Sequence, residues 1–292
     1  MNPSSSIKSS KDSCNGICSS CAEKKSCDDP RAQTSKTEER MKKIKHKIVI
    51  ASGKGGVGKS TVTVNLAAAL KSLGYKVGIL DGDITGPDIP KLLGIEEQKL
   101  MAGPSGLEPA DAGGIKAISM ALLLQSRDSP VVWRGPMKMA ALKQFIGEVN
   151  WGDMDFLLVD LPPGTSDEPI SIAQLIPGLD GAIVVTTPQE VALLDSRKAV
   201  NMFLMMNVPM LGIVENMSGL VCPHCGQKID VFKTGGGEQA ARELGVPFLG
   251  AIPLDTEIGR LGDMGKAFAD KDTPSAKAFG EIVNAILARL EG

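Results

Sequence analysis

Short runs of apolar, β-branched residues alternate along most of the chain with longer stretches of mixed polarity. The apolar runs predict strands at residues 47–51, 76–80, 155–159, 181–186, 209–214 and 247–252. The longer stretches predict helices at residues 59–73, 189–206, 237–244 and 274–290. Strands that alternate with helices in this way predict an α/β fold, in which helices cover both faces of a mostly parallel sheet.

The first 40 residues differ in composition from the rest of the chain. Residues 1–40 carry serines, lysines and four cysteines but almost no large apolar side chain. Such a segment cannot bury enough apolar surface to fold alone, so we expect a disordered tail unless a metal orders it. We expect residues 41–292 to form one domain. Within it, the Gly/Pro-rich residues 103–114 are predicted to be a surface excursion and residues 219–230 an inserted Cys-x-x-Cys loop.

A glycine-rich loop stands between the first predicted strand and the first predicted helix. It fits the Walker A pattern and reads Gly53-Lys54-Gly55-Gly56-Val57-Gly58-Lys59-Ser60-Thr61. Its glycines let backbone N–H groups converge on phosphate oxygens, at a helix N-terminus whose dipole also favours anions. We expect Lys59 to pair with the β- and γ-phosphates of ATP and Ser60 to ligate Mg²⁺. The sequence therefore predicts a three-layer P-loop NTPase.

Carboxylates follow two of the predicted strands. Asp81 and Asp83 come directly after the strand at 76–80, and Asp160 ends the strand at 155–159. The carboxyl ends of parallel strands meet at one edge of a sheet, beside the phosphate loop. We interpret Asp160 as the residue that holds Mg²⁺ through water, and Asp83 as the residue that orients or activates the attacking water. The role of Asp81 is left open.

The cysteines are distributed unevenly. Cys14, Cys18, Cys21 and Cys27 lie in the tail, whereas Cys222 and Cys225 form a Cys-Pro-His-Cys motif. In a reducing compartment such clusters favour metal ligation over disulfides. A closed tetrahedral site needs four ligands, which two copies of the motif would supply across a two-fold axis. The motif predicts a metal but leaves zinc and an iron–sulfur cluster open.

Composition narrows the choice of partners. The formal net charge is −2 and aromatic residues make up 3% of the chain, so neither a nucleic acid nor an anionic membrane surface is expected. No apolar run is long enough to cross a bilayer, and the N-terminus lacks the apolar core of a secretory signal. We expect a cytoplasmic protein.

Lys54 adds specificity to the phosphate loop. A lysine directly after the first glycine resembles the deviant Walker A loop of ATPases related to MinD, ParA and nitrogenase iron protein. The resemblance implies that Lys54 reaches across a dimer to the partner's nucleotide, where it acts like an arginine finger. Lys54, Lys59 and Asp83 are thus the expected catalytic residues.

Four further segments resemble the Mrp/ApbC branch of iron–sulfur cluster carrier and scaffold ATPases. They are Asp81-Gly-Asp-Ile-Thr-Gly-Pro-Asp-Ile-Pro90, Trp133-Arg-Gly-Pro136, Asp160-Leu-Pro-Pro-Gly-Thr165 and Glu215-Asn-Met-Ser218. The resemblance implies a homodimer with a 4Fe-4S cluster bridged by Cys222 and Cys225 of both subunits. It also implies ATP-dependent transfer of the cluster to apo-proteins, with Asn216 contacting adenine and Pro253 lining the base.

Two questions stay open in this reading. Cys18, Cys21 and Cys27 resemble the last three cysteines of a tail cluster motif in eukaryotic cytosolic scaffolds of this family, but Cys14 departs from that spacing. The tail cysteines are therefore a possible second site for a cluster or zinc. The alternative function is a partitioning ATPase of the MinD/ParA kind with a structural zinc at the Cys222/Cys225 pair.

Overall fold

The computed structural model describes residues 30–103, 106–124, 126, 133–222, 225–229, 231–268 and 273–291. The four tail cysteines, for which a second metal site is predicted, lie outside the described residues. Within the stretch expected to be a tail, helix α1 (Pro30–Met41) packs against helix α4 (Gly135–Glu148), and its last residue Met41 is buried. None of the described helices combines the length and apolarity that a membrane span requires.

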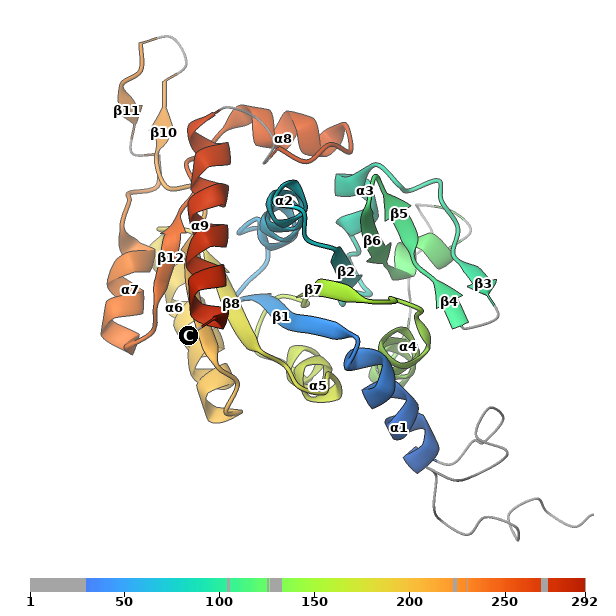
Figure 1. Ribbon diagram of the computed structural model, residues 1–292. Helices are drawn as coiled ribbons and strands as arrows, with labels where there is room; N and C mark the ends of the chain where they lie inside the picture. The colour runs from blue at the N-terminus through green and yellow to red at the C-terminus, as the bar shows by residue number, and fades with distance from the viewer. Residues whose placement is uncertain are drawn as a thin grey trace, which may run out of the picture.

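An eight-stranded sheet runs through the middle of the molecule (Figure 1). Its strands, in spatial order, are β12 (Phe248–Ala251), β9 (Met210–Glu215), β8 (Gly181–Thr186), β1 (Ile44–Ser52), β7 (Met154–Asp160), β2 (Val77–Asp81), β6 (Ile115–Ile118) and β5 (Ala110–Ala112). All neighbouring strands are parallel except β5, which is antiparallel to β6. The predicted mostly parallel sheet is confirmed.

Helices cover both faces of this sheet. On one face they are α2 (Lys59–Ser72), α3 (Ile89–Leu93), α8 (Thr256–Asp263) and α9 (Pro274–Leu290). On the other face they are α1, α4, α5 (Asp167–Leu175), α6 (Glu190–Met205) and α7 (Gly236–Leu244). The remaining elements are the short 3₁₀ helix η3 (Met120–Leu123) and the two-stranded pairs β3 (Met101–Gly103) with β4 (Gly106–Glu108) and β10 (Leu220–Val221) with β11 (Lys228–Ile229). The three-layer architecture is as predicted.

The central strands are apolar at nearly every position because both of their faces are buried. In β1, Ile48 and Ile50 pack into the core under α2, whereas Val49 and Ala51 pack into the core on the opposite face. Side chains alternate between the faces of a strand, so a strand covered on both sides needs apolar residues throughout. This position at the centre of the sheet carries the phosphate loop at the carboxyl end of β1.

The sheet extends further than the apolar runs predicted. Residues 110–112, expected to belong to a surface excursion, form the edge strand β5, and residues 115–118 form β6 beside β2. The prediction of a simple excursion was wrong at this point. Short strands near a sheet edge carry little periodicity of their own, and they are stabilised by pairing, β6 with β2 and β5 with β6.

Candidate functional site

The phosphate loop occupies the turn from β1 into α2. Gly56 and Gly58 both have φ of 82°, a left-handed conformation that L side chains rarely adopt. Gly58 is also the residue that caps the N-terminus of α2. These two glycines thus form a loop whose backbone N–H groups lie at a helix N-terminus, the arrangement that binds phosphate.

Gly53 has a different reason to be glycine. A Cβ at this position would lie 2.1 Å from the carbonyl carbon of Asp195 and 2.3 Å from the backbone nitrogen of Ser196. Both atoms belong to the backbone of α6, which cannot give way as a flexible side chain would. The absence of a side chain at Gly53 therefore seats the phosphate loop directly on α6.

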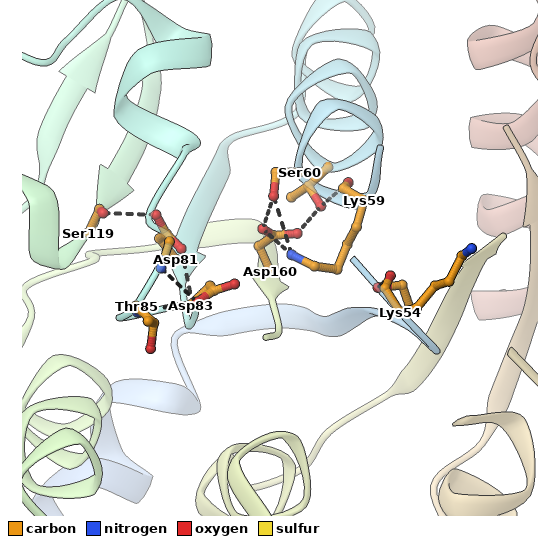
Figure 2. A network of polar contacts seen from close by, with 11 residues as sticks. Lys54, Lys59, Ser60, Asp81, Asp83, Thr85, Ser119 and Asp160 are labelled. Carbon is orange, nitrogen blue, oxygen red and sulfur yellow. Dashed lines mark hydrogen bonds and ion pairs between the residues drawn. The ribbon is translucent and has the colours of Figure 1, made fainter. Parts of the chain in front are cut away.

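Asp160 accepts hydrogen bonds from polar side chains at the start of α2 (Figure 2). Its Oδ2 accepts hydrogen bonds from Lys59 Nζ and Ser60 Oγ, both at 2.6 Å, and its Oδ1 accepts one from Thr63 Oγ1 at 2.7 Å. Asp160 and Lys59 are both buried. A buried carboxylate needs such partners, because removal of a charge from water is unfavourable unless an opposite charge and hydrogen bonds compensate.

The group formed by Lys59, Ser60 and Asp160 has the chemistry to bind Mg²⁺ and a nucleoside triphosphate. A lysine, a hydroxyl and a carboxylate meet at the N-terminus of α2, where backbone dipoles favour anions. Lys59 and Ser60 are the residues that would hold the phosphates and Mg²⁺, and Asp160 lies beside them. Its role towards Mg²⁺ stays a prediction. Thr61 lies half-buried in the same first turn.

Asp81 is a second buried carboxyl group on the neighbouring strand. It is paired in register with Asp160, and it is 1% exposed. Ser119 Oγ donates a hydrogen bond to its Oδ2 at 2.8 Å, and the backbone N–H of Asp83 donates to its Oδ1 at 3.2 Å. Burial, reinforced by the negative charge of Asp160, raises the pKa of Asp81 well above its ordinary value.

Asp83 is the second residue of the loop that follows β2. Its Oδ1 accepts hydrogen bonds from the backbone N–H groups of Thr85 at 3.2 Å and Gly86 at 3.0 Å, which stabilise a turn in the loop (Figure 2). The structure places this residue at the same carboxyl edge of the sheet as Asp81 and Asp160. Its role towards the attacking water stays a prediction.

Lys54 points away from the Lys59–Asp160 group (Figure 2). Its backbone carbonyl accepts a hydrogen bond from Ser52 Oγ at 2.9 Å, which fixes the turn at the start of the loop. Among the described residues, its Nζ makes no hydrogen bond or ion pair. The two lysines of one loop therefore point in separate directions.

Asn216 reaches the phosphate loop from the other side. Its Nδ2 donates a hydrogen bond to the carbonyl oxygen of Val57 at 2.9 Å, although the two residues are 159 positions apart in the chain. Pro253, half-buried, follows Ile252, whose N–H bonds to the carbonyl of Glu215. The structure thus brings Asn216 and Pro253 to neighbouring strand ends, whereas the contact of both with adenine stays a prediction.

Cys222 and Cys225 lie on the hairpin formed by β10 and β11, which projects from the body of the molecule (Figure 1). Cys222 donates its N–H to the carbonyl of Gln227, and its own carbonyl accepts the N–H of Gly226, both at 2.9 Å. Gly226 adopts a φ of 73°, which closes the turn. Cys225 is exposed and Cys222 is half-buried. In the described part of one chain, no three metal-ligating side chains gather at one point.

Three residues of this region escaped the sequence reasoning. Thr63 and Ser119 bind the two buried carboxylates, but nothing in their local sequence distinguishes them from ordinary helix and loop residues. Lys138 in α4 donates hydrogen bonds to Thr85 Oγ1 and Glu168 Oε1, both at 2.8 Å. Lys138 lies two residues after the Trp-Arg-Gly-Pro motif, which was the only available signal.

Comparisons with known proteins agree on one family. Residues 43–287 match the ParA family model described as NUBPL iron-transfer P-loop NTPase. An iron-sulfur cluster carrier protein of Methanocaldococcus jannaschii is 52% identical over 284 residues, which cover 96% of this chain and 98% of the relative. The cytosolic Fe-S cluster assembly factor CFD1 of Eremothecium gossypii is 51% identical over 225 residues, which cover 74% of this chain and 80% of the relative.

Solved structures place the fold in the same group. A nucleotide-binding protein from Archaeoglobus fulgidus, in complex with ADP, has a TM-score of 0.73 and 39% identity, with 83% of this chain and 94% of that chain covered. The cell division ATPase MinD of Pyrococcus furiosus has a TM-score of 0.62 at 24% identity over 84% of this chain and 99% of that chain, which shows the fold alone. With a matching family model and close relatives over nearly its whole length, the chain belongs to the NUBPL iron-transfer family of P-loop NTPases, as its resemblance to the Mrp/ApbC branch predicted.

Proposed function

We propose that this protein is an ATP-dependent iron–sulfur cluster carrier. Two copies bind one 4Fe-4S cluster through Cys222 and Cys225 of each subunit, and ATP hydrolysis is coupled to transfer of the cluster to apo-proteins. The observation that carries the proposal is the projecting hairpin, which presents two thiols at the carboxyl edge of a sheet that also holds a phosphate loop. The names of the relatives from M. jannaschii and E. gossypii support the same cargo.

The geometry of the hairpin favours a site shared between two chains. One chain supplies two thiols from one tight turn, whereas a 4Fe-4S cluster takes four thiolate ligands. An exposed turn can meet its copy across a two-fold axis without rearrangement of either domain. The same dimer would let Lys54 of one subunit approach the nucleotide of the other.

Residues of the phosphate loop and of the strand ends around it have separate parts in the proposed hydrolysis. Lys59 and Ser60 hold the phosphates and Mg²⁺, and Asp83 orients the water that displaces ADP from the γ-phosphoryl group to yield inorganic phosphate. Lys54 supplies positive charge to the oxygens on which negative charge accumulates. Asn216 and Pro253 bind the base.

The alternative of a MinD-like partitioning ATPase needs an amphipathic helix free to bind a membrane. Helix α9 has an apolar face, but Phe279, Ile282, Val283 and Ile286 on this face are buried in the core under the sheet. The likeness to MinD structures shows only the fold, and in such a protein the Cys pair would only hold a structural zinc. We therefore favour the carrier.

Iron and sulfide analysis of anaerobically purified protein tests the proposal. The variant that replaces Cys14, Cys18, Cys21 and Cys27 with Ser isolates the hairpin site in the full chain. We expect one 4Fe-4S cluster per two chains, a dimer in solution, and loss of both the cluster and part of the self-association after Cys222→Ser or Cys225→Ser. Nucleotide binding by the Ser variants is the control. A full cluster in each monomer, or zinc in place of iron, would contradict the shared site.

Transfer needs a separate measurement. The loaded dimer is mixed with the apo form of a 4Fe-4S protein, and activation of that protein is followed with ATP, with a non-hydrolysable analogue and without nucleotide. We expect transfer to be fastest with ATP. Equal rates in all three mixtures would show that hydrolysis is not coupled to transfer, even if the cluster is bound as proposed.

A further inference from the structure

Glu215, the last residue of β9, is a carboxylate with no exposed surface. It accepts hydrogen bonds from Ser218 Oγ at 2.5 Å, from the N–H of Gly235 at 2.9 Å and from the N–H of Gly237 at 2.5 Å. Among the described residues, no lysine, arginine or histidine forms an ion pair with it. The N-terminus of α7 and these donors compensate its buried charge instead.

The donors lie on opposite sides of the cysteine hairpin. Ser218 comes just before the inserted residues 219–230, and Gly235 and Gly237 come after them. The entering side is also held by the backbone, because the N–H of Ser218 bonds to the carbonyl of Ile252 at 2.9 Å. One carboxylate thus joins the two ends of the segment that carries Cys222 and Cys225.

The next residue connects the same point to the phosphate loop. Asn216 donates from Nδ2 to Val57 and from its backbone N–H to the carbonyl of Thr186 at 2.8 Å. A Cβ added at Gly58 would lie 2.3 Å from Asn216 Nδ2 and 3.7 Å from Met217 Cε. The loop and this segment are packed so closely that Asn216 leaves no room for even one added carbon atom at Gly58.

Met217 makes the connecting segment stiff. Its φ of 58° is left-handed, a conformation that a residue with a side chain adopts only when its surroundings impose it. Here the backbone bonds of Asn216 on one side and Ser218 on the other impose it. A segment constrained at both ends transmits a displacement rather than absorbing it by a change in dihedral angle.

We propose that Glu215 is a positioning residue that couples the state of the phosphate loop to the position of the cysteine hairpin. A change in the loop at Val57 and Gly58 passes through Asn216 to Glu215. Because Glu215 holds both ends of the hairpin, the two thiols move together. The proposal rests on the proposed function in assigning the Cys pair to the cluster. The coupling itself is a property of the cluster-free protein and can be measured without a cluster.

Thiol reactivity tests the coupling. The cluster-free full chain is alkylated with iodoacetamide under reducing conditions, and modification of Cys222 and Cys225 is followed by mass spectrometry of their peptides. In the wild type we expect saturation with a non-hydrolysable ATP analogue and Mg²⁺ to change the rate at Cys225 or Cys222 on the order of fivefold or more. In Glu215→Gln the ratio of the alkylation rate with the analogue to the rate without it should move towards one, while nucleotide affinity is retained.

Two further variants guard against a trivial result. Ser218→Ala removes a single hydrogen bond of the carboxylate and should give an intermediate ratio even if Glu215→Gln folds poorly. Glu243→Gln changes an exposed carboxylate of α7, which pairs with Arg197, and should behave like the wild type.

The outcomes separate the coupling from the carrier function. A nucleotide effect that persists unchanged in both Glu215→Gln and Ser218→Ala would overturn the role of Glu215. Equal alkylation rates with and without the nucleotide in the wild type would overturn the coupling. The proposed function would still be decided by the cluster content of the dimer.

Discussion

Lys59 Nζ lies 2.6 Å from Asp160 Oδ2, and both side chains are buried. The amine that is expected to bind phosphate therefore already has an anionic partner. Binding of a nucleotide must exchange part of this contact for phosphate oxygens and Mg²⁺. Because both side chains are already buried, this exchange does not require either charge to be removed from water first.

Replacement of the two lysines of the phosphate loop should affect different steps, nucleotide binding for Lys59 and hydrolysis for Lys54. We expect Lys59→Ala to abolish nucleotide binding, because it removes the cation that contacts the phosphates within the same chain. We expect Lys54→Ala to bind ATP with nearly normal affinity but to lower kcat by about a hundredfold or more, because its charge acts mainly in the transition state. Titration with a fluorescent nucleotide and a phosphate-release assay measure the two effects. Hydrolysis by Lys54→Ala at the wild-type rate would disprove action on the partner's nucleotide.

Asp81 should make the stability of the nucleotide-free protein depend on pH. Its pKa is raised in the folded state, so between the ordinary pKa of an aspartate and this raised value the native state binds more protons than the unfolded state. The free energy of unfolding should therefore fall as pH rises through this window, by at most about 1.4 kcal/mol per pH unit from this group.

Urea unfolding of wild type and Asp81→Asn, without nucleotide or Mg²⁺, measures this contribution from pH 4 upward (a range that begins at about the ordinary aspartate pKa). We expect the difference in unfolding free energy to change in favour of the Asn variant as pH increases. Parallel pH profiles for the two proteins would show that Asp81 is ionised in the empty protein.

Gly53 should tolerate no side chain. The Cβ of Gly53→Ala would meet the backbone of Asp195, so the loop and α6 must separate, at a cost of about 1–3 kcal/mol of stability. Gly55→Ala is the matched control, because its Cβ would meet only Pro163 Cγ at 3.9 Å. Thermal unfolding of the nucleotide-free variants compares them. Equal melting temperatures for the two would contradict the close approach to α6.

Lys138 should support hydrolysis without binding the nucleotide. It joins Thr85, in the loop after Asp83, to Glu168 in α5. We expect Lys138→Met to lower kcat by about tenfold, because the loop that carries Asp83 loses its restraint, and to change KM for ATP little. Lys143→Met, an exposed lysine of the same helix, is the control. An unchanged kcat in Lys138→Met would show that the bridge to Thr85 has no part in the reaction.

The phosphate loop and the central strands could be predicted from the sequence by itself. Apolar runs such as residues 47–51 are buried on both faces, and this burial leaves a pattern that can be recognised locally. The spacing of glycines, Lys59 and Ser60 is also local, since one loop between a strand and a helix must supply every contact. The family followed from the same local motifs, which a match over most of the chain confirmed.

Which distant residues meet depends on the packing of the whole chain. The order of the strands places β1 between β7 and β8, and this order brings Asp160 to Lys59 across 101 positions and Asn216 to Val57 across 159. The contacts of Gly53 with α6 and of Glu215 with both ends of the hairpin arise in the same way. A residue's local pattern reports whether it is buried, whereas its partner depends on how strands are ordered and helices pack, and this is a property of the whole chain.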